Sequence, residues 1–172
     1  MISEDRALEI LRDEGCSSKV MDHIRAVAKV SEEIAQNISD AGHDVDVKRV
    51  KIGALLHDVG RSRTHGLDHG VEGGRILRDR GLTEFAPFAE NHIGTGIAAE
   101  EAEGLDIPTK DYMPGSLEEK IVTYGDNLIR DNEVQSFEEA LKELEEKIGS
   151  GHPSIERFRD LHKELQDLGG LE

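Results

Sequence analysis

The stretch Ile52–Gly60, IGALLHDVG, is the most apolar part of this sequence, and it ends in the pair His57–Asp58 followed closely by a glycine. Asp46 is a good N-cap, so the pattern predicts a helix over residues 47–60 that stops at the glycine. His57 would share a helix face with three small or apolar positions: Val50, Gly53 and Ala54. The stretch therefore predicts a buried helix that carries an imidazole and a carboxylate into the interior.

A second His-Asp pair serves as an internal control. His43 and Asp44 lie in the polar connection GHDVDV, and no apolar helix leads into them. Such dipeptides also arise by chance in a chain with 8 histidines. We interpret His43–Asp44 as loop and keep only the pair at 57–58 as a candidate site.

On both sides of this stretch, apolar residues recur at helical spacing and the runs end in helix-stop signals. No segment shows the alternation of apolar and polar residues that is typical of strands. Capping-box signatures at Ser116 with Glu119 and at Ser136 with Glu139 open two of the later helices. Segment 94–115 is the least defined, with a weak helix at 98–103. The sequence predicts one all-α helical bundle of about seven or eight helices, at residues 4–15, 18–41, 47–60, 69–81, 83–93, 117–131, 137–148 and 153–168.

Composition and charge exclude several classes of protein. The 172 residues include 37 acidic and 21 basic side chains, which gives a net charge of −16, and this argues against a long nucleic acid as partner. The single cysteine, Cys16, excludes a disulfide framework and a Cys-based metal site. The chain has no long apolar run, and its acidic start lacks the order of a signal peptide. We therefore expect a cytoplasmic protein that does not associate with membranes.

Four more ionisable side chains fall on or beside inward faces of predicted helices: His23, His69, His92 and Asp126. Taken singly, a histidine on an apolar face is usually a core residue bonded to a backbone carbonyl, and a lone aspartate is usually solvated. Together with His57 and Asp58, however, they form a set of buried ionisable groups that cannot easily all find partners among themselves. A metal cluster would bind every one of them as a ligand. The sequence thus predicts a metal site built from facing helices.

The ligand types restrict which metal the site would hold. Nitrogen and oxygen donors without cysteine suit Mn, Fe, Ni, Co or Zn, and the imidazoles make Mg a poorer match. We expect one or two divalent ions. Their positive charge would allow a small phosphorylated ligand to bind to an otherwise acidic protein. The two remaining histidines, His152 and His162, lie outside the set and are expected at the surface.

The order of His23, His57–Asp58 and Asp126 resembles the HD superfamily of metal-dependent phosphohydrolases, over about residues 16–131. HDVG at 57–60 is similar to the HD-Ile-Gly variant. Further motifs around the other candidates resemble HD proteins with two-metal sites, including enzymes that split symmetrical dinucleoside tetraphosphates: HGLDHGVEGGRIL, NHIGTG and EKIVTYGDNL. The GYP signature of the cyclic di-guanylate phosphodiesterase branch is absent.

This resemblance implies a ligand set and a reaction. His23, His57, Asp58 and Asp126 would hold a first ion, and His69 and His92 would complete a second, with Asp58 bridging the two. The implied function is hydrolysis of a phosphoester or phosphoanhydride in a small nucleotide-like substrate by metal-activated water, which Asp58 would orient. Residues 1–172 would form a single HD-type domain. Residues 136–172 match no motif, and we expect them to form a helical cap or an interaction surface.

Residues just after the motif are candidates for contact with the substrate. Arg61 stands where many relatives have lysine, and Arg61 and Arg63 would bind phosphate groups as bidentate donors. His65 is a candidate proton donor to the leaving group, the alternative being an exposed loop histidine. Substrate specificity is expected to lie in segment 94–115.

Two other functions stay open at this point. One is a sensor or scaffold module that binds a metal or nucleotide without turnover. A module that has lost catalysis has no need of all the metal ligands, and this sequence has a ligand residue at every expected position. Related helical His/Asp sites also activate oxygen, so a di-iron oxygenase is a third candidate. The sequence does not name the substrate, the metal or the oligomeric state.

Overall fold

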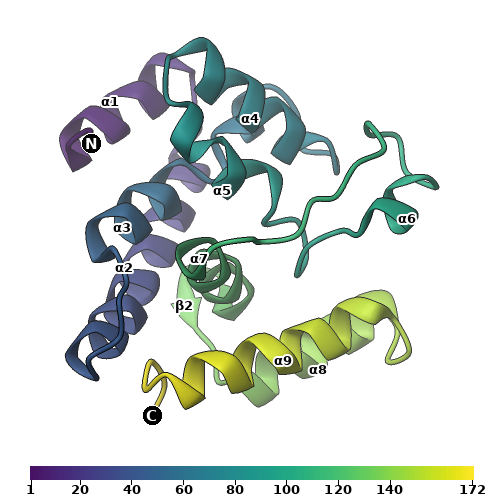
Figure 1. Ribbon diagram of the computed structural model, residues 1–172. Coiled ribbons are helices and arrows are strands. Elements are labelled where there is room, and N and C mark those ends of the chain that lie inside the picture. The colour runs from purple at the N-terminus through teal and green to yellow at the C-terminus, as the bar shows by residue number, and fades with distance from the viewer.

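The computed structural model describes residues 1–172 and is built almost entirely of helices (Figure 1). The predicted all-α fold is confirmed. None of the helices combines the length and the apolar character that crossing a membrane requires. The elements in chain order are α1 (Glu4–Asp13), α2 (Ser18–Asp40), α3 (Val47–Leu56), the 3₁₀-helix η1 (Val59–Ser62), α4 (His69–Asp79), the 3₁₀-helix η2 (Thr83–Phe85), α5 (Ala86–Glu90), α6 (Ala99–Ala102), α7 (Leu117–Leu128), β1 (Ile129–Arg130), β2 (Glu133–Val134), α8 (Phe137–Ile148) and α9 (Pro153–Asp167).

Helix α2 is the longest element, and its sequence explains both its start and its packing. The hydroxyl of Ser17 caps the helix by accepting a hydrogen bond from the backbone N–H of Val20. α2 packs against α3 and α7 at the centre of the fold. One stripe of residues along α2, at alternating steps of four and three, is buried throughout: Val20, Ile24, Val27, Ser31, Ile34 and Ile38.

Several predicted boundaries were wrong, each for a local reason. α3 ends at Leu56 instead of residue 60, so the His-Asp pair lies in the junction between α3 and η1. α7 ends at Leu128 instead of 131, because Asp131 and Asn132 adopt φ of 49° and 64° and turn the chain back into the β1–β2 hairpin. Pro87 lies in the first turn of α5, at its second residue, and the predicted helix 83–93 is split into η2 and α5. The weak segment forms α6, so there are nine α-helices and not seven or eight.

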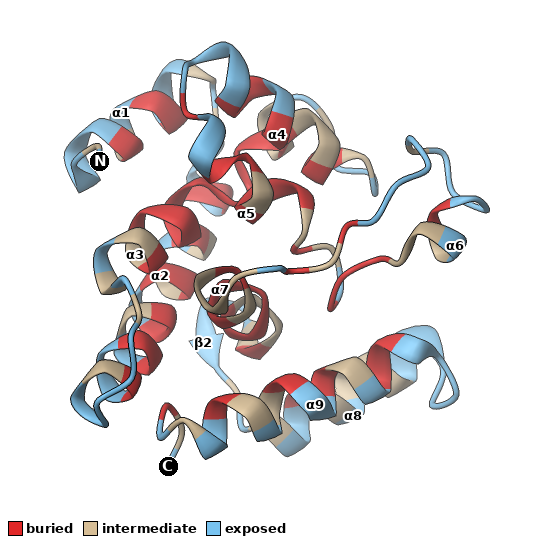
Figure 2. Cartoon of the chain, viewed as in Figure 1, coloured by how far each residue is buried: buried red, intermediate tan, exposed pale blue.

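The core is one continuous cluster of 33 buried apolar residues to which every long helix contributes (Figure 2). Most of its members are aliphatic, as the scarcity of aromatic residues in the sequence requires. Figure 2 shows the buried faces of α2, α3, α5 and α7 turned toward one another. Polar side chains that lie beside these apolar faces are therefore buried as well.

The C-terminal hairpin of α8 and α9 packs on α7 through an aromatic group. The ring of Phe158 lies 5.6 Å from Tyr124 and 5.1 Å from Phe137, between ring centroids. His162 was expected at the surface, but it is half-buried and stacks on Phe137, and its Nδ1 accepts a hydrogen bond from the hydroxyl of Tyr124 at 2.7 Å. His152 is exposed, as expected. Residues 136–172 are thus anchored to the helix that carries Asp126.

Segment 94–115 is held by a small core of its own and by contacts with α7. Ile97, Ala102 and Tyr112 form a separate buried cluster, and Ile97 pairs with Tyr112 in an antiparallel bridge. The amide of Asn127 donates a hydrogen bond to the carbonyl of Gly94 at 2.7 Å. The segment therefore lies beside the residue that follows Asp126.

Candidate metal centre

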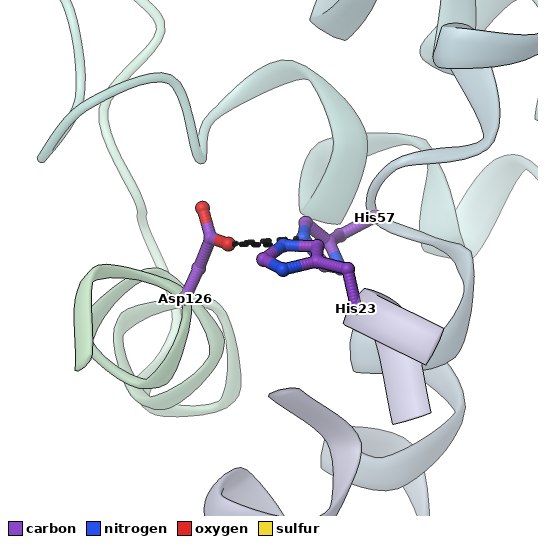
Figure 3. A group of neighbouring side chains, drawn as sticks. All are labelled: His23, His57 and Asp126. Carbon is purple, nitrogen blue, oxygen red and sulfur yellow. Dashed lines mark hydrogen bonds and ion pairs between the residues drawn. The ribbon is translucent and has the colours of Figure 1, made fainter. Parts of the chain in front are cut away.

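Five separate parts of the chain bring six ionisable side chains to one point. The pair His57–Asp58 comes from the α3–η1 junction, and the other residues come from four further elements. Figure 3 shows the imidazoles of His23 and His57 directed at one carboxylate oxygen of Asp126. All six were predicted from the sequence: His23 on α2, His57 and Asp58, His69 at the start of α4, His92 after α5, and Asp126 on α7.

Three of the imidazoles are oriented in the same way by the backbone. The Nδ1–H of His57, His69 and His92 donates to the carbonyl three residues earlier, at 2.6, 2.8 and 2.7 Å respectively. In the neutral ring this bond places the proton on Nδ1 and leaves Nε2 with a lone pair directed into the site. It is the arrangement found for metal-ligating histidines, which donate their other ring nitrogen to a carbonyl or carboxylate.

One oxygen of Asp58 faces two of these imidazoles. Its Oδ1 lies 3.2 Å from Nε2 of His69 and 3.2 Å from Nε2 of His92. The two Nε2 atoms are 3.0 Å from each other, and both carry lone pairs because their protons are on Nδ1. Lone pairs at that distance repel unless a proton or a cation lies between them, so this side of Asp58 has the donor set of a cation site.

The other oxygen of Asp58 faces a second set. Its Oδ2 lies 3.6 Å from Nε2 of His23 and 3.7 Å from Nε2 of His57. Oδ1 of Asp126 lies 2.9 Å and 3.4 Å from the same two nitrogens. The donor atoms of His23, His57 and Asp126 are all within 4.8 Å of one another, and so are those of His57, Asp58 and His92. The two groups thus overlap at His57, directly after α3.

Buried polar atoms without a hydrogen-bond partner also indicate that these residues fit a divalent cation. Nε2 of His57 and Oδ1 of Asp58 are buried and have no hydrogen-bond partner. An unpaired buried acceptor costs about 1–3 kcal/mol. Two of them in one cluster, both with lone pairs to donate, are explained by a cation that accepts both.

Electrostatics keep the two carboxylates ionised. Burial favours the neutral acid at Asp58, but the charge of His57 and hydrogen bonds to neighbouring imidazoles outweigh it and hold the pKa well below its usual range. Burial acts in the same direction at Asp126, where the bond to His23 and the contacts of His57 lower the pKa of the carboxyl. Both groups are therefore anionic at neutral pH, as metal ligation requires.

The pKa values of His57 and His92 shift in opposite directions. Burial opposes protonation of His57, but Asp58 and Asp126 outweigh it and raise the pKa of the ring to about 9. At His92, burial dominates and lowers the pKa, and the neighbouring charge of His57 adds to it, although both carboxylates act in the other direction. Without a bound cation His57 therefore carries a second proton, on Nε2, which partly balances the two carboxylates, and a divalent cation would displace it.

The close packing around residue 60 explains why the motif HDVG at 57–60 ends in glycine. A side chain at this position would overlap the carbonyl oxygen of His69 and lie 2.6 Å from the backbone nitrogen of Gly73. η1 and the start of α4 therefore touch backbone to backbone, and this contact places His69 beside Asp58.

Replacing Gly60 with alanine should separate η1 from α4 and move His69. We expect a loss of at least about 2 kcal/mol in the free energy of unfolding, because backbone atoms cannot yield as side chains do. Denaturant unfolding of Gly60→Ala would measure it. The matched control is Gly151→Ala, where an added methyl group meets open space and stability should hardly change. Equal stability of both variants would contradict the close contact.

The three residues predicted to contact substrate have different positions. Arg61 is half-buried, its Nε donates to Oδ2 of Asp58 at 3.2 Å, and it lines both cavities beside the six donors. His65 is exposed and lines the smaller of these cavities, of about 510 Å³. Arg63 lines neither of the two cavities, and its guanidinium donates to Glu14 at 2.6 Å. Glu14 also binds Arg80, so two cations hold it in place.

The open side of the cluster is where His23 and Asp126 lie. Their side chains are 27% and 21% exposed, whereas those of His57, Asp58, His69 and His92 are exposed by 7% or less. A cavity of about 740 Å³ reaches the cluster from this side. Sequence reasoning missed several residues that line the two cavities: Lys19, Gln135, Glu143, Leu144, Lys147 and Ile148.

Comparisons with protein sequences agree with the geometry. The family model described as HD domain matches residues 20–131. An uncharacterized protein of Methanocaldococcus jannaschii is 47% identical over 165 residues, which are 95% of this chain and 97% of that protein. The proteins named tRNA (cytidine(56)-2'-O)-methyltransferase of Picrophilus torridus and Thermoplasma volcanium are 35% and 33% identical over 168 residues. This chain spans only 47% and 48% of their lengths.

A solved structure has the same fold. The HD domain of the L. monocytogenes phosphodiesterase PgpH, crystallised in complex with cyclic-di-AMP, aligns with a TM-score of 0.58. The alignment covers 96% of each chain at 16% sequence identity. A second structure of the same domain aligns with a TM-score of 0.54. At this identity the likeness concerns the fold.

Proposed function

Because this chain belongs to the HD-domain family, we propose that it is a metal-dependent phosphohydrolase that cleaves a phosphoester or phosphoanhydride bond in a small nucleotide-like substrate. The observation that carries the proposal is the convergence of six donors on one point, with Nε2 of His57, His69 and His92 directed inward and an oxygen of Asp58 left without a hydrogen-bond partner. A purely structural cluster would leave no buried carboxylate oxygen unpaired.

Asp58 would contribute to both ions. His23, His57 and Asp126 would hold one ion together with Asp58, and His69 and His92 would hold a second together with the same carboxylate. This division follows the two sets of contacts described above. When bound, divalent ions of this kind lower the pKa of water toward neutrality and neutralise phosphate charge.

The chain's own side chains would orient the substrate at the open side of the cluster. Arg61 is the phosphate-binding residue in this proposal, since its guanidinium lies beside Asp58 and has further N–H groups to donate. His65, exposed in the neighbouring cavity, is the proposed proton donor to the leaving group. Arg63 is left out of the proposed phosphate contacts, because it is engaged with Glu14.

Two observations support a small nucleotide as the substrate class. The PgpH domain with the same fold was crystallised with a nucleotide, cyclic-di-AMP. The net charge of −16 disfavours a long nucleic acid and tolerates a small phosphorylated molecule at a cationic centre.

The test is a substrate screen on metal-loaded protein. Phosphomonoesters, nucleotides and dinucleoside polyphosphates would each be incubated with the chain in the presence of Mn²⁺, Fe²⁺, Ni²⁺ or Co²⁺. Release of phosphate or of a nucleotide product supports the proposal. Stoichiometric metal with no release from any class would favour a binding module instead, and oxygen uptake by the iron-loaded protein would favour an oxygenase.

A further inference from the structure

The cavity that opens on the metal centre is larger than a phosphate group needs. Its volume is about 740 Å³, in the usual range for sites that enclose a whole small ligand. At one end it contacts His23, Asp58 and Asp126, and it continues along α8 to the α8–α9 connection. Whatever binds there has room for a substantial group beside the phosphate.

Part of the cavity lining, away from the six donor residues, is apolar and exposed. The chain has five large hydrophobic side chains with high exposure, and three of them line this cavity: Leu67 at 41%, Leu105 at 38% and Ile148 at 37%. They come from three distant segments, so chain proximity does not explain their meeting. Leu144 and Ile97 also line the same space. Exposed apolar residues that gather at a pocket are a mark of a ligand.

α8 is fixed in place relative to the metal centre. The β1–β2 turn joins α8 directly to α7, which carries Asp126. At the other end of the hairpin, the guanidinium of Arg157 donates to both carboxylate oxygens of Glu101 and to the carbonyl of Gly96. Thr95 adds a bond to the carbonyl of Ser154. The apolar face of α8 is thus a preformed wall.

Polar groups occupy one edge of this apolar space. The amide of Gln135 donates to Glu143 at 3.1 Å, and both residues line the cavity. Lys147 lines it too and makes no ion pair, although this chain has a large surplus of carboxylates. Apolar faces with hydrogen-bonding groups at the edge match the chemistry of a heterocyclic base, which has flat apolar faces and a polar rim.

We propose that the α8 face formed by Leu144 and Ile148, together with Ile97 and Leu105, binds the nucleobase of the substrate. This inference rests on the proposed function and names the part of the chain that selects the substrate. α8 lies outside residues 20–131, the part matched by the family model, so the selectivity is a property of the C-terminal hairpin. It also widens the expected specificity region beyond segment 94–115.

A binding experiment tests the base site without any turnover. Methyl-labelled protein would be titrated by NMR with nucleoside 5′-monophosphates of adenine, guanine, cytosine and uracil, and with ribose 5-phosphate and inorganic phosphate. We expect the methyl signals of Leu144, Ile148 and Ile97 to move with at least one nucleotide and to stay in place with the other two compounds. Equal shifts with all compounds, or none with any nucleotide, would overturn the proposal. Signals that change with protein concentration alone would assign the face to a second copy and overturn it too.

A kinetic experiment separates this inference from the proposed function. With the best nucleotide substrate from the screen, Ile148→Ser should raise KM by about fivefold and leave kcat unchanged, because it removes apolar contact with a part of the substrate that does not react. Val134→Ser is the matched control, since Val134 is 58% exposed and does not line the cavity. An unchanged KM in Ile148→Ser would reject the base site while leaving phosphohydrolysis intact. Absence of hydrolysis in the unmodified protein would reject the proposed function, and the NMR titration would still decide on base binding.

Discussion

Replacing Asp58 with alanine is expected to lower kcat/KM for phosphate release by at least about 10³-fold, to the limit of detection. Asp58 contacts both sets of donors, with Oδ1 toward His69 and His92 and Oδ2 toward His23 and His57. Its loss removes a shared ligand and leaves four imidazoles without the anion that holds them together. The bound metal, determined by elemental analysis of the purified protein, should fall together with the activity.

The chain supplies a matched control in its other His-Asp pair. Asp44→Ala removes the same group from His43–Asp44, which lies in an exposed loop outside the metal centre. This variant should keep full activity and full metal content. Circular dichroism would establish that Asp58→Ala remains helical. A folded Asp58→Ala protein that still releases phosphate at the normal rate would remove the central residue of the proposed site.

The fold was largely predictable because its helices carry their signals locally. Caps such as Ser17 and Asp46 and the stripe of α2 are properties of neighbouring residues, and the structure has helices where these signals stand. The errors came where the backbone is decided by single residues. Asp131 and Asn132 reverse the chain at positive φ, and the helical pattern before them contains no stop signal.

The six clustered side chains were predictable for a related reason. His23, His69 and Asp126 lie on helices whose apolar neighbours fix their direction, and His57, Asp58 and His92 follow within two residues of a helix end. Arg63 shows the limit of that reasoning, because its direction depends on Glu14, a residue 49 positions away. Lys147 and Ile148 show the same limit, since they reach the cavity only because the β1–β2 turn and Arg157 bring α8 beside it.

Replacing His69 with alanine should reduce the metal content from about two ions to about one. Nε2 of His69 contacts Oδ1 of Asp58 and Nε2 of His92, and His69 is not a member of the group formed by His23, His57 and Asp126. Its removal leaves one imidazole and one carboxylate oxygen on that side, too few donors for tight binding of a transition metal. The ion on the other side keeps His23, His57 and Asp126, together with Oδ2 of Asp58.

Two measurements on the manganese-loaded protein would check this division of ligands. Elemental analysis gives the stoichiometry, and electron paramagnetic resonance distinguishes a coupled pair of Mn²⁺ ions from an isolated one. His69→Ala should change the coupled signal to the isolated one, whereas His43→Ala, in the exposed loop, should leave it coupled. If His69→Ala still holds two ions, His69 is not a ligand. If it holds none, the two groups of donors do not bind independently, and Asp58 then acts as the centre of a single inseparable cluster.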